Sequence, residues 1–458
     1  MSAVVQDIAS ASPGHALAFG EPSRPLAFGH GMAVDLRTFE RHVRGLAALL
    51  PDGRHAINLC DDRYRFLVAF CAAAVRGQVT LLPPSRAPGV IAAELARHPD
   101  SHCLGDDAPD PLPPRYWRLP ARLPEADGPP LRLDPDAIAA IGFTSGSTGM
   151  PSANPKPWAS FRASTAQNLA ALRDLWPAGE VAHVVATVPP QHMYGMELSV
   201  LLPLLGEAAV HAGRPFFPQD IVRALHEAPG NRLLVTTPVH LRALVEACAA
   251  DAGLAPPPLA GIVSATAPMP PELAAAAEAR FGCELRELFG STETCVIAHR
   301  RSARETAWTP YPGVCLQPQP DGSLVHAPHL PGPVALADLV ELHGDGRFLL
   351  RGRNADLLEI AGKRASLGDL TRRLQAVPGV EDGVVFQLDR PGPGGVRRIA
   401  ALAVAPSLDE AAIRAALAES VDPVFLPRPL KRVPALPRNA TGKLPRAALL
   451  ALIGDPSH

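Results

Sequence analysis

Short apolar runs alternate with helix-like segments between residues 137 and 290, and no other feature of the sequence constrains the fold as strongly. The strand-like runs cover residues 137–143, 182–188, 207–212, 232–236, 260–264 and 284–288. The helical segments between them cover residues 158–176, 194–205, 218–228, 239–250 and 270–281. Such alternation predicts an α/β fold with a mainly parallel sheet covered by helices. Ligands of these folds bind at the carboxyl ends of the strands, so functional residues are expected in the loops that follow strands.

Composition excludes several classes of protein. Charged residues make up 19% and apolar residues 47% of the 458-residue chain, which is too apolar for a disordered protein. The 43 basic and 45 acidic residues give no electrostatic signature of nucleic-acid binding. No apolar run approaches the roughly 18 residues of a membrane span, and the N-terminus lacks a basic region followed by an apolar one. Seven cysteines without a C-x-x-C pair fit reduced thiols, so we expect a cytoplasmic protein.

The chain changes character on both sides of the alternating region. Residues 104–136 contain nine prolines among 33 residues, which predicts an irregular surface connection. Near residues 351–356 the pattern changes again, and two strands near 383–389 and 398–404 and a helix near 408–420 indicate a separate small α+β unit. We therefore expect a large N-terminal domain over residues 1–352 and a small C-terminal domain over residues 353–458.

The segment Phe143-Thr-Ser-Gly-Ser-Thr-Gly149 follows a predicted strand directly. Four hydroxyls and two glycines give a loop with many donors and close access to the backbone, which suits phosphate oxygens. It is not a Walker A loop, because the Lys that ends that motif is missing. The predicted phosphate-binding residues are Thr144, Ser145, Gly146, Ser147, Thr148 and Gly149.

This loop resembles the phosphate loop of the adenylate-forming enzymes, which include acyl- and aryl-CoA synthetases, luciferases and peptide-synthetase adenylation domains. Members of that family usually continue with x-P-K, whereas this chain has Met150-Pro-Ser152 and reaches Pro155-Lys156 four residues later. A small insertion would explain the shift, and contact between Lys156 and a phosphate stays open. Only four of the 43 basic residues are lysines, and this rarity carries weight only where a motif surrounds the lysine, as it does at Lys156 and Lys443.

Two further segments extend the resemblance. Phe289-Gly-Ser-Thr-Glu293 resembles the aromatic-G-x-T-E motif, which implies that Thr292 contacts a phosphate of ATP and that Glu293 helps to bind Mg²⁺. Ala337-Asp338 resembles the segment whose Asp accepts hydrogen bonds from the ribose hydroxyls. The resemblance thus implies ATP as a substrate and Mg²⁺ as a cofactor.

The C-terminal part carries two more matches. Gly352-Arg353 through Arg364 resembles the segment in which Arg353 would contact the nucleotide and Asp356 would be the hinge between the large AMP-binding domain and the small lid domain. Pro437–Arg446 resembles the segment that supplies a lysine, here Lys443, to the carboxylate and the α-phosphate. A mobile ammonium can follow the charge as it moves during the reaction.

The acid substrate is indicated by Pro189-Pro-Gln-His-Met-Tyr-Gly195. Family members that activate amino acids place an Asp here to pair with the ammonium group, and this chain has none. The segment instead resembles the P-x-x-H-x-x-G of acyl- and aryl-acid ligases, in which His192 would adjoin the substrate carboxylate. The residues expected to line the acid pocket are Met193, Tyr194, Gly195, Thr236, His240, Ala265 and Phe289.

The resemblance predicts a ligase that activates an acid as an acyl adenylate, releases pyrophosphate, and passes the acyl group to a thiol. We favour a hydroxybenzoate-like aryl acid and leave a medium-chain fatty acid open. The length is similar to that of the aryl acid ligases of aryl-polyene and xanthomonadin-type pathways. The thiol acceptor is either an acyl carrier protein or coenzyme A. Two alternatives remain: a catalytically idle homologue that only binds nucleotide, and a luciferase-like oxidative enzyme.

Overall fold

The computed structural model describes residues 14–144, 152–320, 322–353, 357–360, 363–391, 397–439 and 442–454. The chain divides into two compact units, which are described separately below. The first unit comprises Met1–Val314 and His326–Val334, and the second comprises Cys315–Val325 and Ala335–His458.

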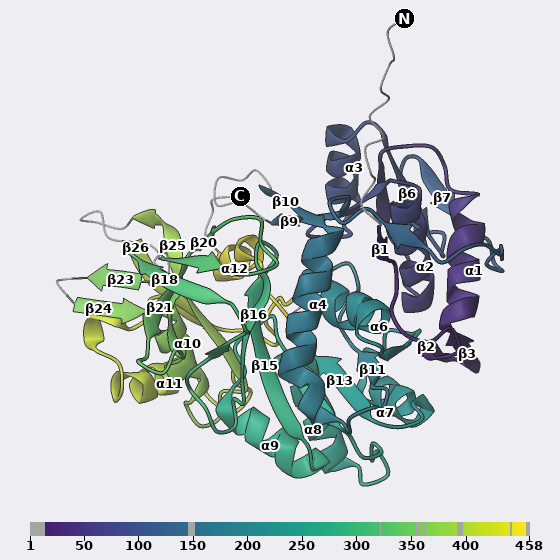
Figure 1. The fold of residues 1–458 in the computed structure, drawn as a ribbon. Coiled ribbons are helices and arrows are strands. Elements are labelled where there is room, and N and C mark those ends of the chain that lie inside the picture. Colours follow the sequence, from purple (N-terminus) through teal and green to yellow (C-terminus); the bar gives the residue numbers. More distant parts are fainter. Residues whose placement is uncertain are drawn as a thin grey trace, which may run out of the picture. The chain divides into compact units, whose positions relative to one another are not determined.

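A nine-stranded sheet forms the centre of the first unit, with the strand order β17-β16-β15-β14-β13-β11-β12-β2-β3 (Figure 1). The strands from β15 to β2 in this order are parallel, and the antiparallel neighbours lie at the two edges. The strands are β2 (Pro25–Gly29), β3 (Met32–Asp35), β11 (His183–Ala186), β12 (Ala209–His211), β13 (Arg232–Thr236), β14 (Gly261–Ser264), β15 (Glu284–Ser291), β16 (Cys295–Arg300) and β17 (Thr309–Pro310). The predicted α/β class and its mainly parallel sheet are confirmed.

A second sheet of six strands has the order β10-β9-β5-β4-β6-β7 and is parallel except for the β9–β10 pair. Its strands are β4 (His55–Asn58), β5 (Val79–Leu82), β6 (Ser101–Gly105), β7 (Tyr116–Arg118), β9 (Ile138–Thr144) and β10 (Ser152–Pro157). The sequence pattern predicted one sheet for the alternating region 137–290, but the first strand of that region, β9, belongs to the six-stranded sheet. Alternation locates strands and does not specify their neighbours. β1 (His15–Ala16) and β8 (Arg132–Leu133) form a separate pair, so the 104–136 connection contains two short strands, β7 and β8.

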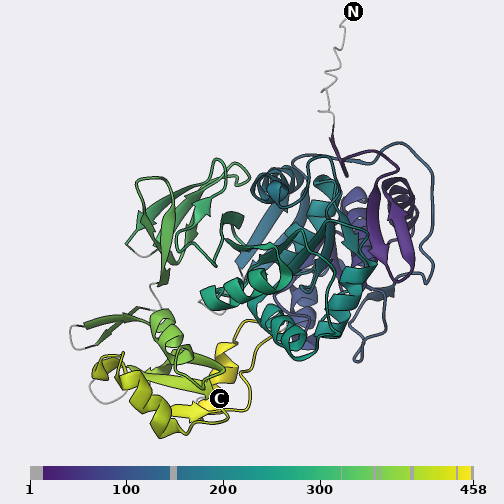
Figure 2. The same ribbon diagram turned by 90° about the horizontal axis from the view of Figure 1, so that it is seen from below.

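The helices of the first unit cover both faces of the nine-stranded sheet, except for Pro88–Arg97, which packs against the six-stranded sheet (Figures 1 and 2). They are α1 (Leu36–Ala47), α2 (Arg63–Val75), α3 (Pro88–Arg97), α4 (Trp158–Leu172), α5 (Met193–Met196), a π-helical turn Glu197–Leu201, α6 (Leu202–Leu205), α7 (Pro218–Glu227), α8 (Pro238–Ala250) and α9 (Pro271–Phe281), with a short 3-10 helix at Arg173–Leu175. Capping residues explain where three helices begin. The side chains of Asp35, Asp62 and Thr237 accept hydrogen bonds from backbone N–H groups in the first turns of α1, α2 and α8. Proline occupies the first turn of α3, α7, α8 and α9, where its missing N–H has no cost.

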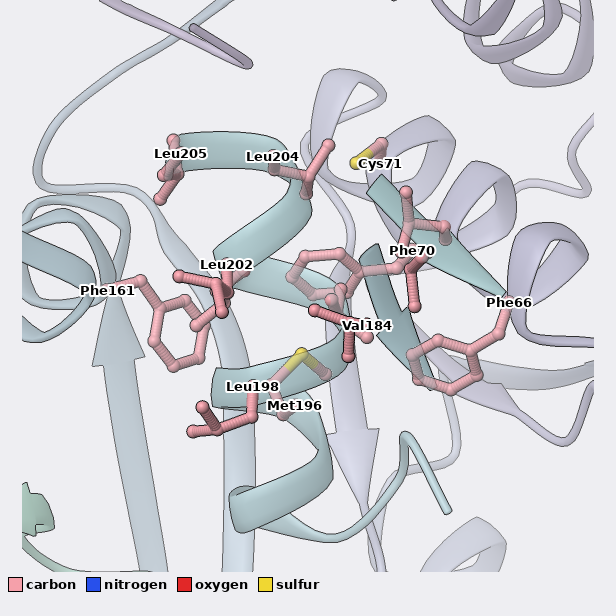
Figure 3. Packing of buried hydrophobic residues seen from close by; sticks show 14 of the residues in the cluster. Phe66, Phe70, Cys71, Phe161, Val184, Met196, Leu198, Leu202, Leu204 and Leu205 are labelled. Carbon is pink, nitrogen blue, oxygen red and sulfur yellow. The ribbon is translucent and has the colours of Figure 1, made fainter. Parts of the chain in front are cut away.

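Two apolar cores hold the first unit together. The larger core gathers side chains from α1, α2, α4, β11 and the Met193–Leu205 segment, as Figure 3 shows for Phe66, Phe70, Phe161, Val184 and Leu202. The smaller core lies on the other face of the nine-stranded sheet and packs α7, α8 and α9 against β11, β13 and β14. α2 is buried over most of its length, which explains its apolar sequence.

The second unit is an α+β assembly of short sheets. Its strands are β18 (Cys315–Gln319), β19 (Gly322–His326), β20 (Val334–Leu336), β21 (Asp338–Leu342), β22 (Phe348–Arg353), β23 (Leu357–Ile360), β24 (Lys363–Ser366), β25 (Asp382–Pro391), β26 (Arg397–Val404) and β27 (Leu430–Arg432). Its helices are α10 (Leu367–Gln375), α11 (Glu410–Ala418), α12 (Arg446–Ile453) and a 3-10 turn Pro423–Phe425. The strands and the helix predicted near 383–389, 398–404 and 408–420 correspond to β25, β26 and α11. The hinge residue Asp356 lies outside the described residues, so the boundary predicted at 352/353 stays a prediction.

Candidate active site

The predicted phosphate loop follows β9 directly. β9 ends at Thr144, whose backbone pairs with Ser152 at the start of β10. The two ends of the loop are therefore neighbours in an antiparallel pair. The remaining phosphate-binding predictions lie outside the described residues, as does the side chain of Thr144; they are Ser145, Gly146, Ser147, Thr148 and Gly149.

Gly142, two residues before the end of β9, is the point at which three predicted motifs meet. A Cβ atom at this position would lie 2.5 Å from Cγ2 of Thr292 and 3.2 Å from Cε of Met193. Real Cβ atoms essentially never approach another atom within 3.0 Å, so a larger residue here would displace Thr292. The strand of the phosphate loop, the G-S-T-E segment and the P-x-x-H segment therefore converge at the carboxyl end of β9.

Residues 291–295 form a tight turn between β15 and β16, called here the Thr-Glu turn. Ser291 lies opposite Cys295 in the β15–β16 pair. The backbone N–H groups of Ser291 and Thr294 each donate to the other residue's hydroxyl, at 3.2 and 3.1 Å. Cys295 has a φ of +58°, which is uncommon for a residue other than glycine. Thr292 and Glu293 are half-buried in the middle of this turn.

Lys156 is buried in β10 and supports the Thr-Glu turn. Its Nζ atom donates a 2.7 Å hydrogen bond to the carbonyl oxygen of Glu293, and only 5% of the residue is exposed. The sequence left open whether this ammonium contacts a phosphate, and in the structure it binds the backbone of the turn. The apparent insertion forms the edge strand β10, where Pro155 and Pro157 are tolerated because an edge leaves backbone positions unpaired.

The P-x-x-H segment forms a turn that leads into α5. The backbone N–H of His192 donates to the carbonyl oxygen of Pro189 at 3.2 Å, and His192 is half-buried. Gly195 packs against this turn, since a Cβ there would lie 2.1 Å from the Pro189 oxygen. The Tyr194 hydroxyl donates to the carbonyl oxygen of Val263 at 2.9 Å, and burial raises the pKa of Tyr194. Tyr194 is thereby fixed to β14.

The residues that flank this segment are held by a buried arginine that sequence reasoning missed. Arg63 is the first residue of α2, is fully buried, and donates to the carbonyl oxygens of Ala186 at 2.9 Å and Val188 at 2.8 Å. It also donates to the hydroxyl of Ser199. No motif marks Arg63 among the many arginines, and its one local signal is the capping residue Asp62 directly before it.

The predicted pocket residues Thr236 of β13 and His240 of α8 each form a hydrogen bond with a neighbouring threonine. The hydroxyl of Thr236 lies 3.1 Å from that of Thr187, which the sequence analysis did not select. Nδ1 of His240 lies 2.8 Å from the hydroxyl of Thr237. Burial, reinforced by the positive charge of Arg214, lowers the pKa of His240 to about 4, so its ring is neutral at pH 7.

The remaining pocket predictions lie on neighbouring strands. Ala265 is buried directly after β14, and Thr266 beside it has a φ of +80°, which is strained for a β-branched residue. The ring of Phe289 in β15 packs beside Trp308, with the ring centroids 5.5 Å apart. The guanidinium of Arg300 lies over the same Trp308 ring, 4.4 Å from its centroid. Phe289 thus belongs to an aromatic and cationic cluster on the β15–β16 pair.

The structure brings together two predicted nucleotide contacts in the second unit. Asp338 begins β21 and pairs with Arg353, the last residue of β22. Asp338 is half-buried, and its carbonyl oxygen accepts a hydrogen bond from the hydroxyl of Ser323. The side chain of Arg353 lies outside the described part of the structure.

Lys443 is exposed at the end of a short turn in the second unit. The backbone N–H of Lys443 donates to Oδ1 of Asn439 at 2.9 Å, and the backbone carbonyl of Lys443 accepts from the backbone N–H of Asn439 at 2.8 Å. Arg438 donates to the carbonyl of Gly442 at 2.9 Å and binds both carboxylate oxygens of Asp382. The turn backbone is therefore fixed by residues close in sequence, together with one ion pair to β25.

The conserved pattern of AMP-binding enzymes matches residues 52–321 of this chain, which include the phosphate loop and the Thr-Glu turn. The chain belongs to the AMP-binding enzyme family. It is similar to the 4-coumarate–CoA ligase of Rhodobacter capsulatus, with 34% identity over 311 residues that cover 67% of this chain and 75% of that protein. It is also similar to the sulfoacetate–CoA ligase of Cupriavidus necator, with 26% identity over 96% of this chain and 93% of that protein.

The fold of this AMP-binding enzyme is that of ATP-bound MatB from Rhodopseudomonas palustris. The two structures superpose with a TM-score of 0.80 over 95% of this chain and 97% of MatB, at 18% sequence identity. The predicted architecture, with parallel sheets in a large N-terminal part and a small C-terminal α+β part, is confirmed. No helix in the described parts of the chain is both long and apolar enough to span a membrane.

Membership of the family identifies the reaction class. The chain is an AMP-forming acid–thiol ligase, which uses ATP to activate a carboxylic acid as an acyl adenylate and then transfers the acyl group to a thiol such as that of coenzyme A. The predicted enzyme class and the predicted use of ATP are confirmed at this level.

Proposed function

We propose that this ligase activates a hydroxybenzoate-like aryl acid and transfers it to a phosphopantetheine thiol. The observation that carries the proposal is the convergence of Thr292 and Met193 on Gly142. It brings a residue of the proposed phosphate-binding turn next to a residue of the proposed acid pocket, at the end of the strand that leads into the phosphate loop. A carboxylate bound there would lie close to the phosphates that it attacks.

The first step joins two anions. A carboxylate oxygen attacks the α-phosphorus of ATP, the bond from that phosphorus to the bridging oxygen of pyrophosphate breaks, and pyrophosphate leaves with the bonding electrons. We assign the ammonium of Lys443 to the developing charge between the carboxylate and the α-phosphate. Donors of the loop 144–149 and the hydroxyl of Thr292 would bind phosphate oxygens.

Glu293 fits a site for Mg²⁺. Its carboxylate is half-buried on a turn with a fixed backbone, and Mg²⁺ in nucleotide enzymes is bound through one or two carboxylates together with substrate phosphates. When bound, Mg²⁺ would neutralise charge on those phosphates. Asp338 would accept hydrogen bonds from the ribose hydroxyls, and Arg353 would contact the nucleotide.

In the second step the thiolate sulfur attacks the carbonyl carbon of the acyl adenylate, the carbon–oxygen bond to AMP breaks, and AMP leaves. The family resemblance implies that the small domain rotates about Asp356 between the two steps. His192 would adjoin the substrate carboxylate in the first step. Whether coenzyme A or an acyl carrier protein supplies the thiol is decided by the experiment below.

Three observations favour an aryl acid. Residues 189–195 contain no carboxylate to pair with the ammonium of an amino acid. Met193 and Tyr194 are buried in the segment assigned to the acid pocket, and the neutral ring of His240 suits a hydrogen bond to a phenolic hydroxyl. The similar protein of Rhodobacter capsulatus is named for 4-coumarate, an aromatic acid with one ring hydroxyl whose carboxylate lies one vinyl group from the ring. Membership of the aryl-polyene and xanthomonadin-type ligases is part of this proposal.

The test is pyrophosphate release with MgATP and a panel of benzoates, hydroxybenzoates, amino acids and C4–C12 fatty acids. We expect the highest kcat/KM with a hydroxybenzoate. A higher value for octanoate than for every benzoate would replace the aryl acid by a medium-chain fatty acid. If the enzyme binds ATP but releases no pyrophosphate with any acid, the chain is an idle homologue. Adding coenzyme A or a carrier protein to the best acid then identifies the acceptor.

A further inference from the structure

Three buried polar side chains surround the Thr-Glu turn, and the proposed mechanism does not use them. They are Lys156 of β10, Glu197 of the π-helical turn after α5, and His329 of the segment His326–Val334. At most 5% of each residue is exposed. Buried ionisable groups are costly unless they are paired or hydrogen-bonded, so their hydrogen-bond partners indicate why they are present.

Lys156 and His329 each bind a carbonyl group of this turn, and Glu197 binds the N–H of the residue that directly follows it. Lys156 Nζ donates to the carbonyl oxygen of Glu293 at 2.7 Å, and Nε2 of His329 lies 2.6 Å from the carbonyl oxygen of Thr294. The N–H of Val296 donates to the carboxylate of Glu197, at 3.1 and 3.2 Å from its two oxygens. The three side chains therefore fix the backbone on both sides of Cys295, the residue with positive φ.

Glu197 and His329 are themselves held in place by side chains of α4. Glu197 Oε1 accepts from the hydroxyl of Ser164 at 2.5 Å and from Nδ2 of Asn168 at 3.1 Å, and both donors lie on α4. Nδ1 of His329 lies 2.5 Å from Oε1 of Gln167, also on α4. Glu197 and His329 thus connect the turn to α4, and Lys156 connects it to β10.

We propose that Lys156 is a positioning residue that, together with Glu197 and His329, sets the backbone of the Thr-Glu turn and so presents the Glu293 carboxylate to Mg²⁺ and ATP. The inference rests on the proposed role of Glu293. Lys156 holds the carbonyl of the very residue whose side chain would bind the metal, so the orientation of that peptide determines the direction of the carboxylate. Without the ammonium, the carbonyl would lose its donor and the turn its fixed geometry.

The first experiment compares Lys156→Met with Lys431→Met. Lys431 is an exposed control for the loss of an ammonium–carbonyl bond, because its Nζ also donates to a backbone carbonyl, that of Leu452, at 2.8 Å. We measure the rise in thermal midpoint on adding MgATP, which requires no acid substrate, and the kinetic constants for MgATP and for the acid. For Lys156→Met we expect a smaller MgATP-induced rise and a loss of about 10–100-fold in kcat/KM for MgATP, with KM for the acid unchanged. Lys431→Met should match the parent.

A second variant separates positioning from charge compensation. Lys156 also lowers the cost of the buried Glu197 charge, since its positive charge favours the ionised carboxylate. The double variant Lys156→Met/Glu197→Gln removes both charges with little change in volume, so it should recover thermal midpoint relative to Lys156→Met while the MgATP defect persists. Lys156→Arg, which keeps a charged donor, should recover part of the MgATP response.

Two results would overturn the inference. One is a Lys156→Met protein whose MgATP-induced rise and kcat/KM equal those of the parent. The other is a double variant that regains both thermal midpoint and MgATP kinetics, because Lys156 would then act only by compensating Glu197. If the parent protein activates no acid, the proposed function fails, whereas a different MgATP-induced rise in Lys156→Met would still support the role of Lys156 in the turn.

Discussion

The Thr-Glu turn and the Lys443 turn carry the two charged groups that we assign to the reaction, and they are built in opposite ways. The first is held by buried side chains from segments more than 30 residues away along the chain, namely Lys156, Glu197 and His329. The second is held by Asn439 and Arg438, four residues or fewer from their partners in the turn, and Lys443 itself is exposed. The comparison predicts that damage to the first turn costs stability as well as activity, and that loss of the Lys443 ammonium costs activity alone.

The largest expected effect is that of Lys443→Arg. A planar guanidinium should not replace a point charge that bridges the carboxylate and the α-phosphate, so adenylation should fall about 10²–10⁴-fold, which is about 3–5 kcal/mol of barrier. The thermal midpoint should stay at the parent value because the side chain is exposed. Pyrophosphate release and a thermal melt measure the two quantities, with Lys431→Arg as the control. Near-normal adenylation would remove Lys443 from the mechanism.

The second expected effect is a loss of stability in acid that is confined to the first unit. Burial lowers the pKa of eight described histidines, and all of them belong to that unit: His42, His55, His102, His183, His211, His240, His299 and His329. The unfolded chain titrates these groups near pH 6.5 and so binds more protons than the fold below that pH. The free energy of unfolding therefore decreases as the pH falls below 6.5. For His240 this loss continues down to about pH 4 and amounts to about 3 kcal/mol. Glu197 acts in the opposite direction, since burial raises its pKa.

Hydrogen exchange at pH 7.5, 6 and 5 tests this prediction unit by unit. Amides of β13 and β14 should lose protection before those of β25 and β26. His240→Gln should reduce the dependence on pH. Equal loss of protection in both units would contradict the assignment to the buried histidines.

The third prediction concerns Gly142→Ala. The new methyl group would lie 2.5 Å from Thr292 and 3.2 Å from Met193, and overpacking of this kind costs about 1–3 kcal/mol. We expect a lower thermal midpoint and roughly tenfold slower adenylation, because the shift displaces the turn that carries Glu293. Gly89→Ala in α3 is the control, since a Cβ there meets nothing within 4 Å. Unchanged kinetics in Gly142→Ala would mean that the convergence at this residue has no functional role.

The smallest effect is expected for Arg438→Ala. This variant loses the two-oxygen ion pair with Asp382 and the bond to the Gly442 carbonyl, worth about 1 kcal/mol at a partly exposed site. Adenylation should fall several-fold through poorer placement of Lys443. The exposed pair Arg347–Asp345 offers the control variant Arg347→Ala. A defect as large as that of Lys443→Arg would show that Arg438 acts in the reaction directly.

Local pattern was sufficient to predict most of the elements. The apolar runs 182–188, 232–236 and 260–264 correspond to β11, β13 and β14, because burial and periodicity leave a direct trace in the sequence. The sheet to which β9 belongs was not predictable, since strand pairing joins residues far apart in the chain. The same limit explains why the edge strand β10 was not predicted, since the sequence showed only that Pro155-Lys156 lies later than the x-P-K of the family.

The residues of the site also fall into those that local sequence predicted and those that only the fold reveals. The motifs selected Thr292, Glu293, Asp338 and Lys443 because their types and spacings resemble a family. The residues that fix the backbone around them carry no such mark. Glu197 and His329, which bind the backbone at Val296 and Thr294, become visible only through hydrogen bonds to segments more than 30 residues away, and the same is true of Arg63, which binds the carbonyl groups of Ala186 and Val188. Lys156 was selected because it lies beside the phosphate loop at a shifted spacing, but its partner, the carbonyl of Glu293, lies 137 residues further along.

Detection of the acyl adenylate tests the central claim most directly. The protein is incubated with MgATP and a hydroxybenzoate in the absence of any thiol, quenched, and examined by mass spectrometry. We predict hydroxybenzoyl-AMP in near-stoichiometric amount with the parent protein and at least a hundredfold slower formation with Lys443→Arg. ATP binding without an acyl adenylate from any acid in the panel would contradict the account.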